Sequence, residues 1–138
     1  MASPFLFGGW ALPEPWGVWS QAGKVSLRFP RPLLGLGPVT VEFDVDVFLA
    51  PKHGVERQRI VIRANGTRLE EYSLARAGRL KVTIHEGILE RDAHWLILDL
   101  DLPDRVSPNA LGLSGDRRDL ALGLKSVVLQ RHLRPRLP

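Results

Sequence analysis

The sequence predicts an all-β fold: an antiparallel β-sandwich of the jelly-roll type with seven or eight strands. Short segments alternate apolar and polar residues with a period of two, which is typical of strands that are buried on one face. Gly, Pro, Asn or Asp separate these segments roughly every 8 to 12 residues, the spacing expected of a sandwich. Gly and Pro contribute 13 and 11 of the 138 residues, which favours turns over long helices.

Each expected strand has an apolar face that points into the core. The expected strands, some with their inward residues, are in chain order 24–29 (Val25, Leu27, Phe29), 39–50 (Val41, Phe43, Val45, Val47), 57–64 (Ile60, Ile62), 67–74, 80–85 (Leu80, Val82, Ile84), 94–102 (Leu96, Leu98, Leu100, Leu102) and a terminal strand (Leu120, Leu122, Leu124, Val128). Asn65-Gly66 predicts a two-residue hairpin between two of these strands. Helix is expected only as single turns at 87–91 and 108–113.

The length and composition indicate one globular domain. A chain of 138 residues is the size of a single core, so we expect one sandwich over 1–130 and a basic tail over 131–138. Because the sequence has no cysteine, disulfides, thiolate zinc sites and cysteine nucleophiles are excluded. The segment 1–10 has neither Lys nor Arg and no long apolar run, so no signal peptide or membrane insertion is expected and a cytoplasmic location is predicted.

The positive charge does not indicate nucleic-acid binding. The formal net charge is +4, but the arginines are spread along the chain and usually have carboxylates nearby, and only the tail is basic without compensation. Glu42, Asp44 and Asp46 share one strand face, and one interpretation of this row of carboxylates is a calcium site. We favour cross-strand pairing with the arginines of 57–63, which alternate with the opposite sign, and expect no metal.

The candidates for catalysis are few. The four histidines lack a metal-binding spacing, and Ser114 lacks a nucleophile-elbow motif. Glu14 and Asp116 resemble a glycosidase pair only in residue type, because nothing in the sequence places them at the required separation. The sequence therefore predicts a protein that is not an enzyme and has no cofactor, while a hydrolase or isomerase that uses Glu14 or His94 remains a residual alternative.

Tryptophan is concentrated near the start of the chain. Three of the four tryptophans, Trp10, Trp16 and Trp19, lie within ten positions that also contain Pro13 and Pro15, so this stretch is neither an ordinary strand nor a helix. An indole face packs on the C–H face of a pyranose, and neighbouring carboxylates and amides bind the hydroxyls. The alternative is that these rings close the open end of the sandwich and are buried.

The segment 107–124 is the second conspicuous stretch, with two apolar patches on either side of a polar hinge. Asp116 and Arg118 are close enough in sequence to form a charge-assisted hydrogen bond that fixes the long connection before the last strand. We favour this interpretation over one in which the same polar groups line a ligand cleft.

The two stretches together resemble a known family. The residues that carry the resemblance are Gly9-Trp10, Glu14-x-Trp16-Gly17-x-Trp19-Ser20, Val61-x-x-x-Asn65-Gly66, Leu102-Pro103 and Ser107-Pro108-x-x-Leu111-Gly112-Leu113-Ser114-x-Asp116-x-Arg118-x-Leu120-x-Leu122. They are similar to a bacterial family of uncharacterised β-sandwich domains, often attached C-terminally to envelope polysaccharide glycosyltransferases or phosphoglycerol-transferase-like enzymes. The resemblance spans about 8–129 and brings no assigned chemistry. It is compatible with a free-standing accessory protein and with an excised domain.

The sequence thus predicts a non-catalytic, carbohydrate-binding-module-like sandwich that serves a bacterial surface-polysaccharide system by binding glycan. The candidate binding residues are Glu14, Trp16, Trp19, Asn109, Asp116 and Arg117. The alternative is a structural or interaction module that docks on a glycosyltransferase or self-associates, in which the tryptophans and the segment 131–136 form a protein interface.

Overall fold

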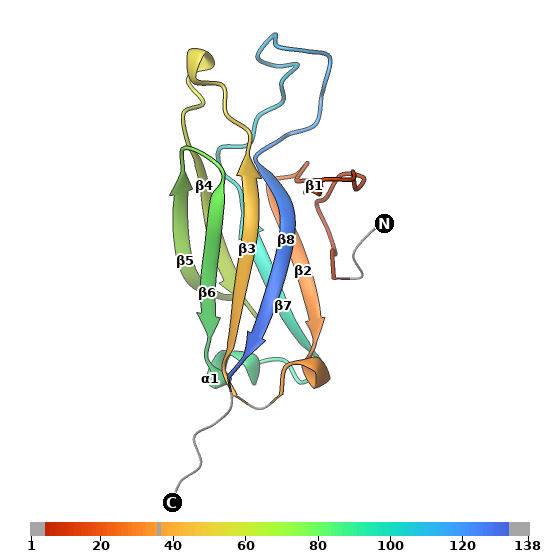
Figure 1. Ribbon diagram of the computed structural model, residues 1–138, viewed down its shortest axis with the longest axis vertical. Coiled ribbons are helices and arrows are strands. Elements are labelled where there is room, and N and C mark those ends of the chain that lie inside the picture. Colours follow the sequence, from red (N-terminus) through yellow and green to blue (C-terminus); the bar gives the residue numbers. More distant parts are fainter. Residues whose placement is uncertain (1–4, 36, 133–138) are drawn as a thin grey trace, which may run out of the picture.

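The fold is an antiparallel β-sandwich, which confirms the predicted class. The structure, a computed structural model, describes residues 5–35 and 37–132, and in this part of the chain two four-stranded sheets pack face to face (Figure 1). The strands are β1 (Val18–Trp19), β2 (Lys24–Pro30), β3 (Val39–Val47), β4 (Gln58–Ala64), β5 (Thr67–Leu74), β6 (Gly78–Ile84), β7 (Trp95–Asp101) and β8 (Leu122–Arg131).

The strand order is that of a jelly roll. One sheet has the order β1-β8-β3-β6 and the other has the order β2-β7-β4-β5. The first strand therefore pairs with the last, the second with the seventh, the third with the sixth and the fourth with the fifth, always antiparallel. The chain is thus a long hairpin that has been rolled into two layers.

The core lies between the inward faces that the alternation predicts. On β3, Val41, Phe43 and Val45 are fully buried, while the carboxylates between them are half-buried. The leucines of β7 at 96, 98 and 100 face them from the other sheet and are equally buried. A side chain that points into this space leaves water completely, which is the main source of favourable free energy for the fold.

The predicted inward position of Val128 is wrong, because a bulge interrupts β8. The register of β3 on β8 pairs Asp44 with Ser126 and Val45 with Leu124, which leaves Lys125 without a partner on β3. An extra residue reverses the alternation beyond it. Val127 therefore points inward, and Val128 is 59% exposed on the outer face.

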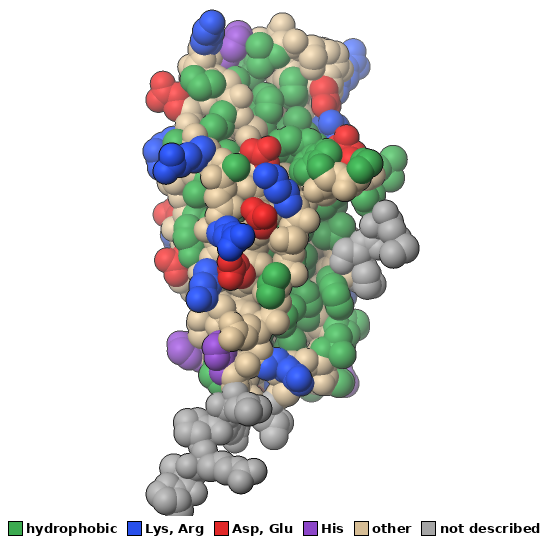
Figure 2. Space-filling view, viewed as in Figure 1, with side chains coloured by type: hydrophobic (Ala, Val, Ile, Leu, Met, Phe, Trp, Pro, Cys, Tyr) green, Lys and Arg blue, Asp and Glu red, His purple; other side chains and the backbone are tan. Residues whose placement is uncertain are grey.

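The predicted pairing of the β3 carboxylates with the arginines of 57–63 is also wrong. β4 lies in the other sheet, so Arg59 binds Asp104 (2.7 Å) and Arg63 binds Asp101 (2.9 Å). The partner of Glu42 is Arg79 of β6, at 3.5 Å, and Figure 2 shows side chains of both charges over this face. Apart from β4 and β5, strands that are consecutive in sequence lie in different sheets here, so nearness in sequence did not identify the partner of the β3 carboxylates.

The short elements connect the strands at the ends of the sandwich. Asn65-Gly66 forms the predicted hairpin between β4 and β5, with φ values of 44° and 83°. The helical turns are η1 (Arg31–Leu33), η2 (Pro51–His53) and α1 (Glu86–Leu89). None of the helices among the described residues is long and apolar enough to cross a membrane.

The last strand extends into the segment expected to be a basic tail. Arg131 is still in β8, and the His132 backbone N–H donates to the Pro38 carbonyl at 2.9 Å. The His132 ring also hydrogen-bonds the Thr40 hydroxyl, at 2.7 Å. The remainder of the expected tail, residues 133–138, lies outside the described residues.

A candidate ligand-binding groove

The first strand is too short to cover the last one. β1 pairs with β8 only at Leu124 and Gly123, because Pro13 and Pro15 precede it and proline cannot donate to a ladder. The chain before these prolines runs along the other sheet instead, where the Arg28 N–H donates to the Phe5 carbonyl (2.9 Å). In the described part of the chain, β8 beyond Leu124 therefore pairs only with β3.

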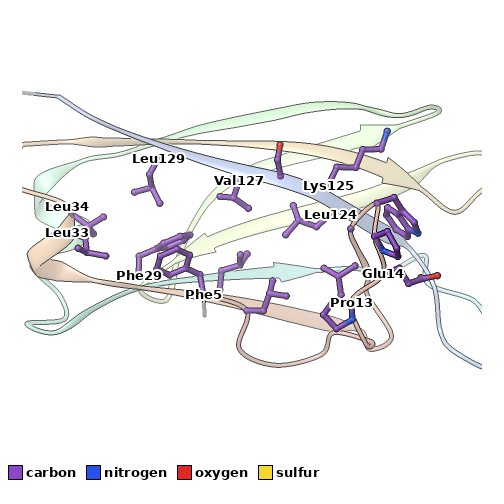
Figure 3. Close-up of a pocket in the computed structure, with 17 residues that line it drawn as sticks. Phe5, Pro13, Glu14, Phe29, Leu33, Leu34, Leu124, Lys125, Val127 and Leu129 are labelled. Atoms are coloured by element: carbon purple, nitrogen blue, oxygen red, sulfur yellow. The ribbon is translucent and has the colours of Figure 1, made fainter. Parts of the chain in front are cut away.

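A groove of about 640 Å³ opens between the two sheets along this uncovered edge. Its walls are formed by β8 on one side and by β2 with the preceding segment 5–6 on the other, so it runs lengthwise along the sandwich (Figure 3). Figure 2 shows hydrophobic side chains gathered on the side of the molecule where β2 and β8 lie. The volume is within the range of about 300–1,000 Å³ in which proteins bind small ligands.

The two ends of the groove differ in chemistry. One end is apolar and is lined by Phe5, Phe29, Leu33, Leu34 and Leu129, of which Phe5 and Phe29 are in ring contact at 5.0 Å. The other end is lined by the turn that contains Pro13 and Pro15 and by the bulge of β8. Figure 3 shows Pro13 and Glu14 near Leu124, at the opposite end from Leu33 and Leu34.

The turn presents an indole at the mouth of the groove. The Glu14 N–H donates to the Gly17 carbonyl (2.7 Å) and the Gly17 N–H donates back to Glu14 (3.1 Å), which closes a tight hairpin with Trp16 at its tip. The rings of Trp16 and Trp19 are in a T-shaped contact, with centroids 5.2 Å apart and planes at 68°. Trp16 is 39% exposed and lines the groove.

Gly123 of β8 provides the space for both indoles. A Cβ at this position would come within 3.1 Å of the Trp16 ring and 3.2 Å of the Trp19 ring. Both rings therefore pack against bare backbone, and any side chain at position 123 would displace them. The orientation of Trp16 is set by Trp19 and by this glycine, not by the turn alone.

The other two tryptophans have different environments. The Trp10 indole N–H donates to the Ser26 carbonyl of β2 at 2.9 Å, and the ring is half-buried against the core, as the packing interpretation predicts. Trp95 is 38% exposed at the start of β7 and does not line the groove. Of the four tryptophans, Trp16 is the one that lines the groove.

The predicted bond between Asp116 and Arg118 is confirmed. The Arg118 guanidinium donates to the Asp116 carboxylate at 2.7 Å, and the Arg118 backbone N–H donates to it at 3.0 Å. These bonds lower the pKa of Asp116 and raise that of Arg118. The end of the long connection before β8 meets the tryptophan-rich stretch at Ser20, whose hydroxyl accepts the N–H groups of Ala121 and Leu122.

The bond at Asp116 predicts an acid-sensitive contribution to stability. Because the folded pKa of this group is lowered, its contribution is fully present above the ordinary pKa of aspartate and is lost as the pH falls below about 4. Asp116→Asn is expected to lower the melting temperature by about 2–4 °C at pH 7, as for a half-exposed ion pair of under ~1 kcal/mol.

Calorimetry of the wild type and the variant from pH 7 to pH 3 checks this expectation, and the two melting temperatures should converge at the acid end. Asp119→Asn, in an exposed position of the same connection, is the matched control and should leave the melting temperature unchanged. A constant difference across the whole pH range would contradict the assignment.

The structure brings together only some of the predicted site residues. Glu14 and Trp16 line the groove, and Trp19 supports Trp16 from behind. Asn109, Asp116 and Arg117 do not line it. The Asn109 N–H donates to the Asp116 carbonyl (2.8 Å) inside the connection, and Arg117 is exposed.

The apolar lining is not evident from the sequence. Leu33 and Leu34 belong to a proline-rich turn, and uninterrupted alternation would place Val127 and Leu129 on the outer face, because the bulge has no clear sequence signal. One signal is present: the terminal strand is long, whereas the prolines limit the strand that would cover it.

Among the described residues, no group of three or more His, Asp or Glu side chains is arranged to hold a metal ion.

No family model matches this sequence, and no curated protein matches it significantly. Among solved structures, the chain is similar to one described as "EclA C-terminal domain; sugar-binding protein", with a TM-score of 0.47 and 11% identity, over 86% of this chain and 72% of that one. The sugar-binding description belongs to that protein.

Proposed function

We propose that the protein is a non-catalytic carbohydrate-binding module. The observation that carries the proposal is the half-exposed Trp16 indole, which contacts the Trp19 ring and packs over Gly123 at the mouth of a 640 Å³ groove. A flat apolar ring that is fixed in orientation while it remains accessible to solvent suits the C–H face of a pyranose.

The polar groups near this ring suit sugar hydroxyls. Glu14 and Trp16 belong to the same turn and both line the groove, and Figure 3 shows Glu14 at the end of the groove opposite Leu33 and Leu34. A carboxylate accepts hydrogen bonds from hydroxyls. Glu14 is the one carboxylate among the lining residues, whereas glycoside hydrolysis usually uses two.

We also propose that the module serves a bacterial surface-polysaccharide system, as an accessory to a glycosyltransferase. The support for this context is the family resemblance of the two motif-rich stretches. These stretches form the tryptophan turn and the connection that Asp116 and Arg118 fix, and they meet where the Ser20 hydroxyl accepts the N–H groups of Ala121 and Leu122.

Removal of the indole tests the proposal. Trp16→Ala is expected to reduce the affinity for a glycan identified on an array of bacterial polysaccharides at least about tenfold, equivalent to about 1.4 kcal/mol, because the stacking surface is lost. Isothermal titration with that glycan measures the change. Circular dichroism of the variant confirms that the sandwich is intact.

Trp95→Ala is the matched control, because Trp95 is equally exposed, at 38% against 39% for Trp16, but does not line the groove. Its affinity should stay within about twofold of the wild type. Equal losses in both variants, unchanged affinity in Trp16→Ala, or no glycan bound at millimolar concentration would each contradict carbohydrate binding at this groove.

A second candidate function is protein interaction through the edge of β8. Residues beyond Leu124 present an edge that no described strand covers, and Val128 is 59% exposed beside it. An uncovered edge is a template for pairing with another strand. This observation favours a module that self-associates or docks on a glycosyltransferase.

Light scattering after size-exclusion chromatography distinguishes the second candidate. If β8 is the interface, the mass should rise with protein concentration or on addition of the glycosyltransferase, and Val128→Lys should abolish the rise by placing a charge on the edge. A monomeric protein that binds no partner and is unaffected by the substitution would exclude this function.

A further inference from the structure

The groove continues well beyond the region that a sugar stacked on Trp16 would occupy. Figure 3 shows Val127 midway along it and Leu33, Leu34 and Leu129 at the far end from Glu14. All are groove-lining residues, and the far end has no charged side chain among its lining residues. Leu33 is 56% exposed there, an arrangement that leaves apolar surface in contact with water unless a ligand covers it.

Polarity therefore changes along a single continuous cavity. Trp16 and the charged residue Glu14 line one end, whereas the side chains that line the Leu33 end are hydrocarbon. A free oligosaccharide would place hydroxyls against this hydrocarbon, where they find no hydrogen-bond partner and lose their hydration. A purely apolar ligand would leave Glu14 facing hydrocarbon at the other end.

We infer that the groove binds a saccharide with an apolar substituent, that is, an alkyl or aryl glycoside or the head region of a glycolipid. The sugar stacks on Trp16, and the substituent lies along Val127 toward Leu33. This inference rests on the proposed carbohydrate-binding function and adds the chemical class of the ligand. The cavity of 640 Å³ has the size of sites for ligands larger than one sugar ring.

The test uses a homologous series of ligands. Methyl, butyl and hexyl glycosides of glucose, galactose and mannose are titrated calorimetrically below their critical micelle concentrations, with a hexyl ether of oligoethylene glycol as the sugar-free amphiphile. For at least one sugar, affinity should rise about two- to fourfold with each methylene, so that the hexyl glycoside binds at least about tenfold more tightly than the methyl glycoside. The sugar-free ether should bind at least about tenfold more weakly than that hexyl glycoside.

Two variants separate the ends of the groove. Leu33→Asp is expected to remove the dependence on chain length and to preserve the affinity for the methyl glycoside, because Leu33 is exposed and contacts only the substituent. Trp16→Ala is expected to weaken every glycoside. Val128→Asp, at a comparably exposed position that does not line the groove, is the matched control and should retain the wild-type series.

Three results would overturn the inference, and they differ in what they imply for the proposed function. Glycosides that bind with the same affinity at every chain length would exclude the apolar subsite and leave carbohydrate binding intact. A sugar-free ether that binds as tightly as the hexyl glycosides would overturn carbohydrate binding as well. Absence of binding by every ligand up to its solubility limit would also overturn both.

Discussion

Replacement of Gly17 by alanine is expected to lower the free energy of unfolding by about 2–4 kcal/mol. Gly17 has φ 154°, and a Cβ there would lie 2.2 Å from the backbone carbonyl oxygen of Leu124. That oxygen is part of the β8 backbone, which cannot move aside as the end of a flexible side chain could. The methyl group would therefore force β1 away from β8 and disturb the hairpin that presents Trp16.

Urea denaturation followed by fluorescence measures the loss for Gly17→Ala. The same variant should also lose glycan affinity, because the turn and the Gly123 surface must stay in register to orient the indole. Gly8→Ala is the control, since a Cβ at Gly8 meets nothing within 4 Å. A Gly17 variant as stable as the Gly8 variant would show that β1 and β8 do not approach as closely as described.

Replacement of Ser20 by alanine is expected to cost about 2–4 kcal/mol, a large effect for the loss of a single oxygen. The Ser20 hydroxyl is fully buried and accepts the backbone N–H groups of Ala121 (3.2 Å) and Leu122 (3.0 Å). Alanine would leave two buried N–H groups without an acceptor. A buried donor that loses its partner costs about 1–3 kcal/mol.

Ser73→Ala is the comparison for Ser20. The Ser73 hydroxyl accepts a hydrogen bond from Arg57 at 2.8 Å on an exposed face, where water replaces the lost partner, so stability should change by less than about 0.5 kcal/mol. Chemical denaturation of both variants separates the two environments. Equal small losses would mean that water reaches the start of β8.

Much of the fold is predictable because a half-buried strand records its orientation in its side chains. The alternation over Val39–Val47 and Trp95–Asp101 identifies both faces of β3 and β7 from the residues alone. The register of β8 is not predictable, since Lys125 has no sequence feature that marks a bulge. Partner choice is also not predictable, because the rolled hairpin sends β3 and β4 to different sheets.

The candidate site is predictable only where side-chain chemistry marks it. Trp16 and Glu14 stand out in composition, and both line the groove. The hydrocarbon end is built from ordinary leucines such as Leu33 and Leu129, whose role depends on a strand that is too short to cover them. Asn109 and Asp116 show the converse, because their polar groups are used within the connection itself.

The nested pairing of the strands has a consequence for when the groove forms. The β4–β5 hairpin joins residues that are close in sequence, as the pairing of Ala64 with Thr67 shows, whereas β1 and β8 are far apart in sequence, as the pairing of Val18 with Leu124 shows. Contacts between residues so distant in sequence are entropically costly to close and are expected to form late in folding. A ligand that spans this junction would therefore hold β1 and β8 together and slow global unfolding, so that the lifetime of the native state would increase with the fraction of protein that has ligand bound.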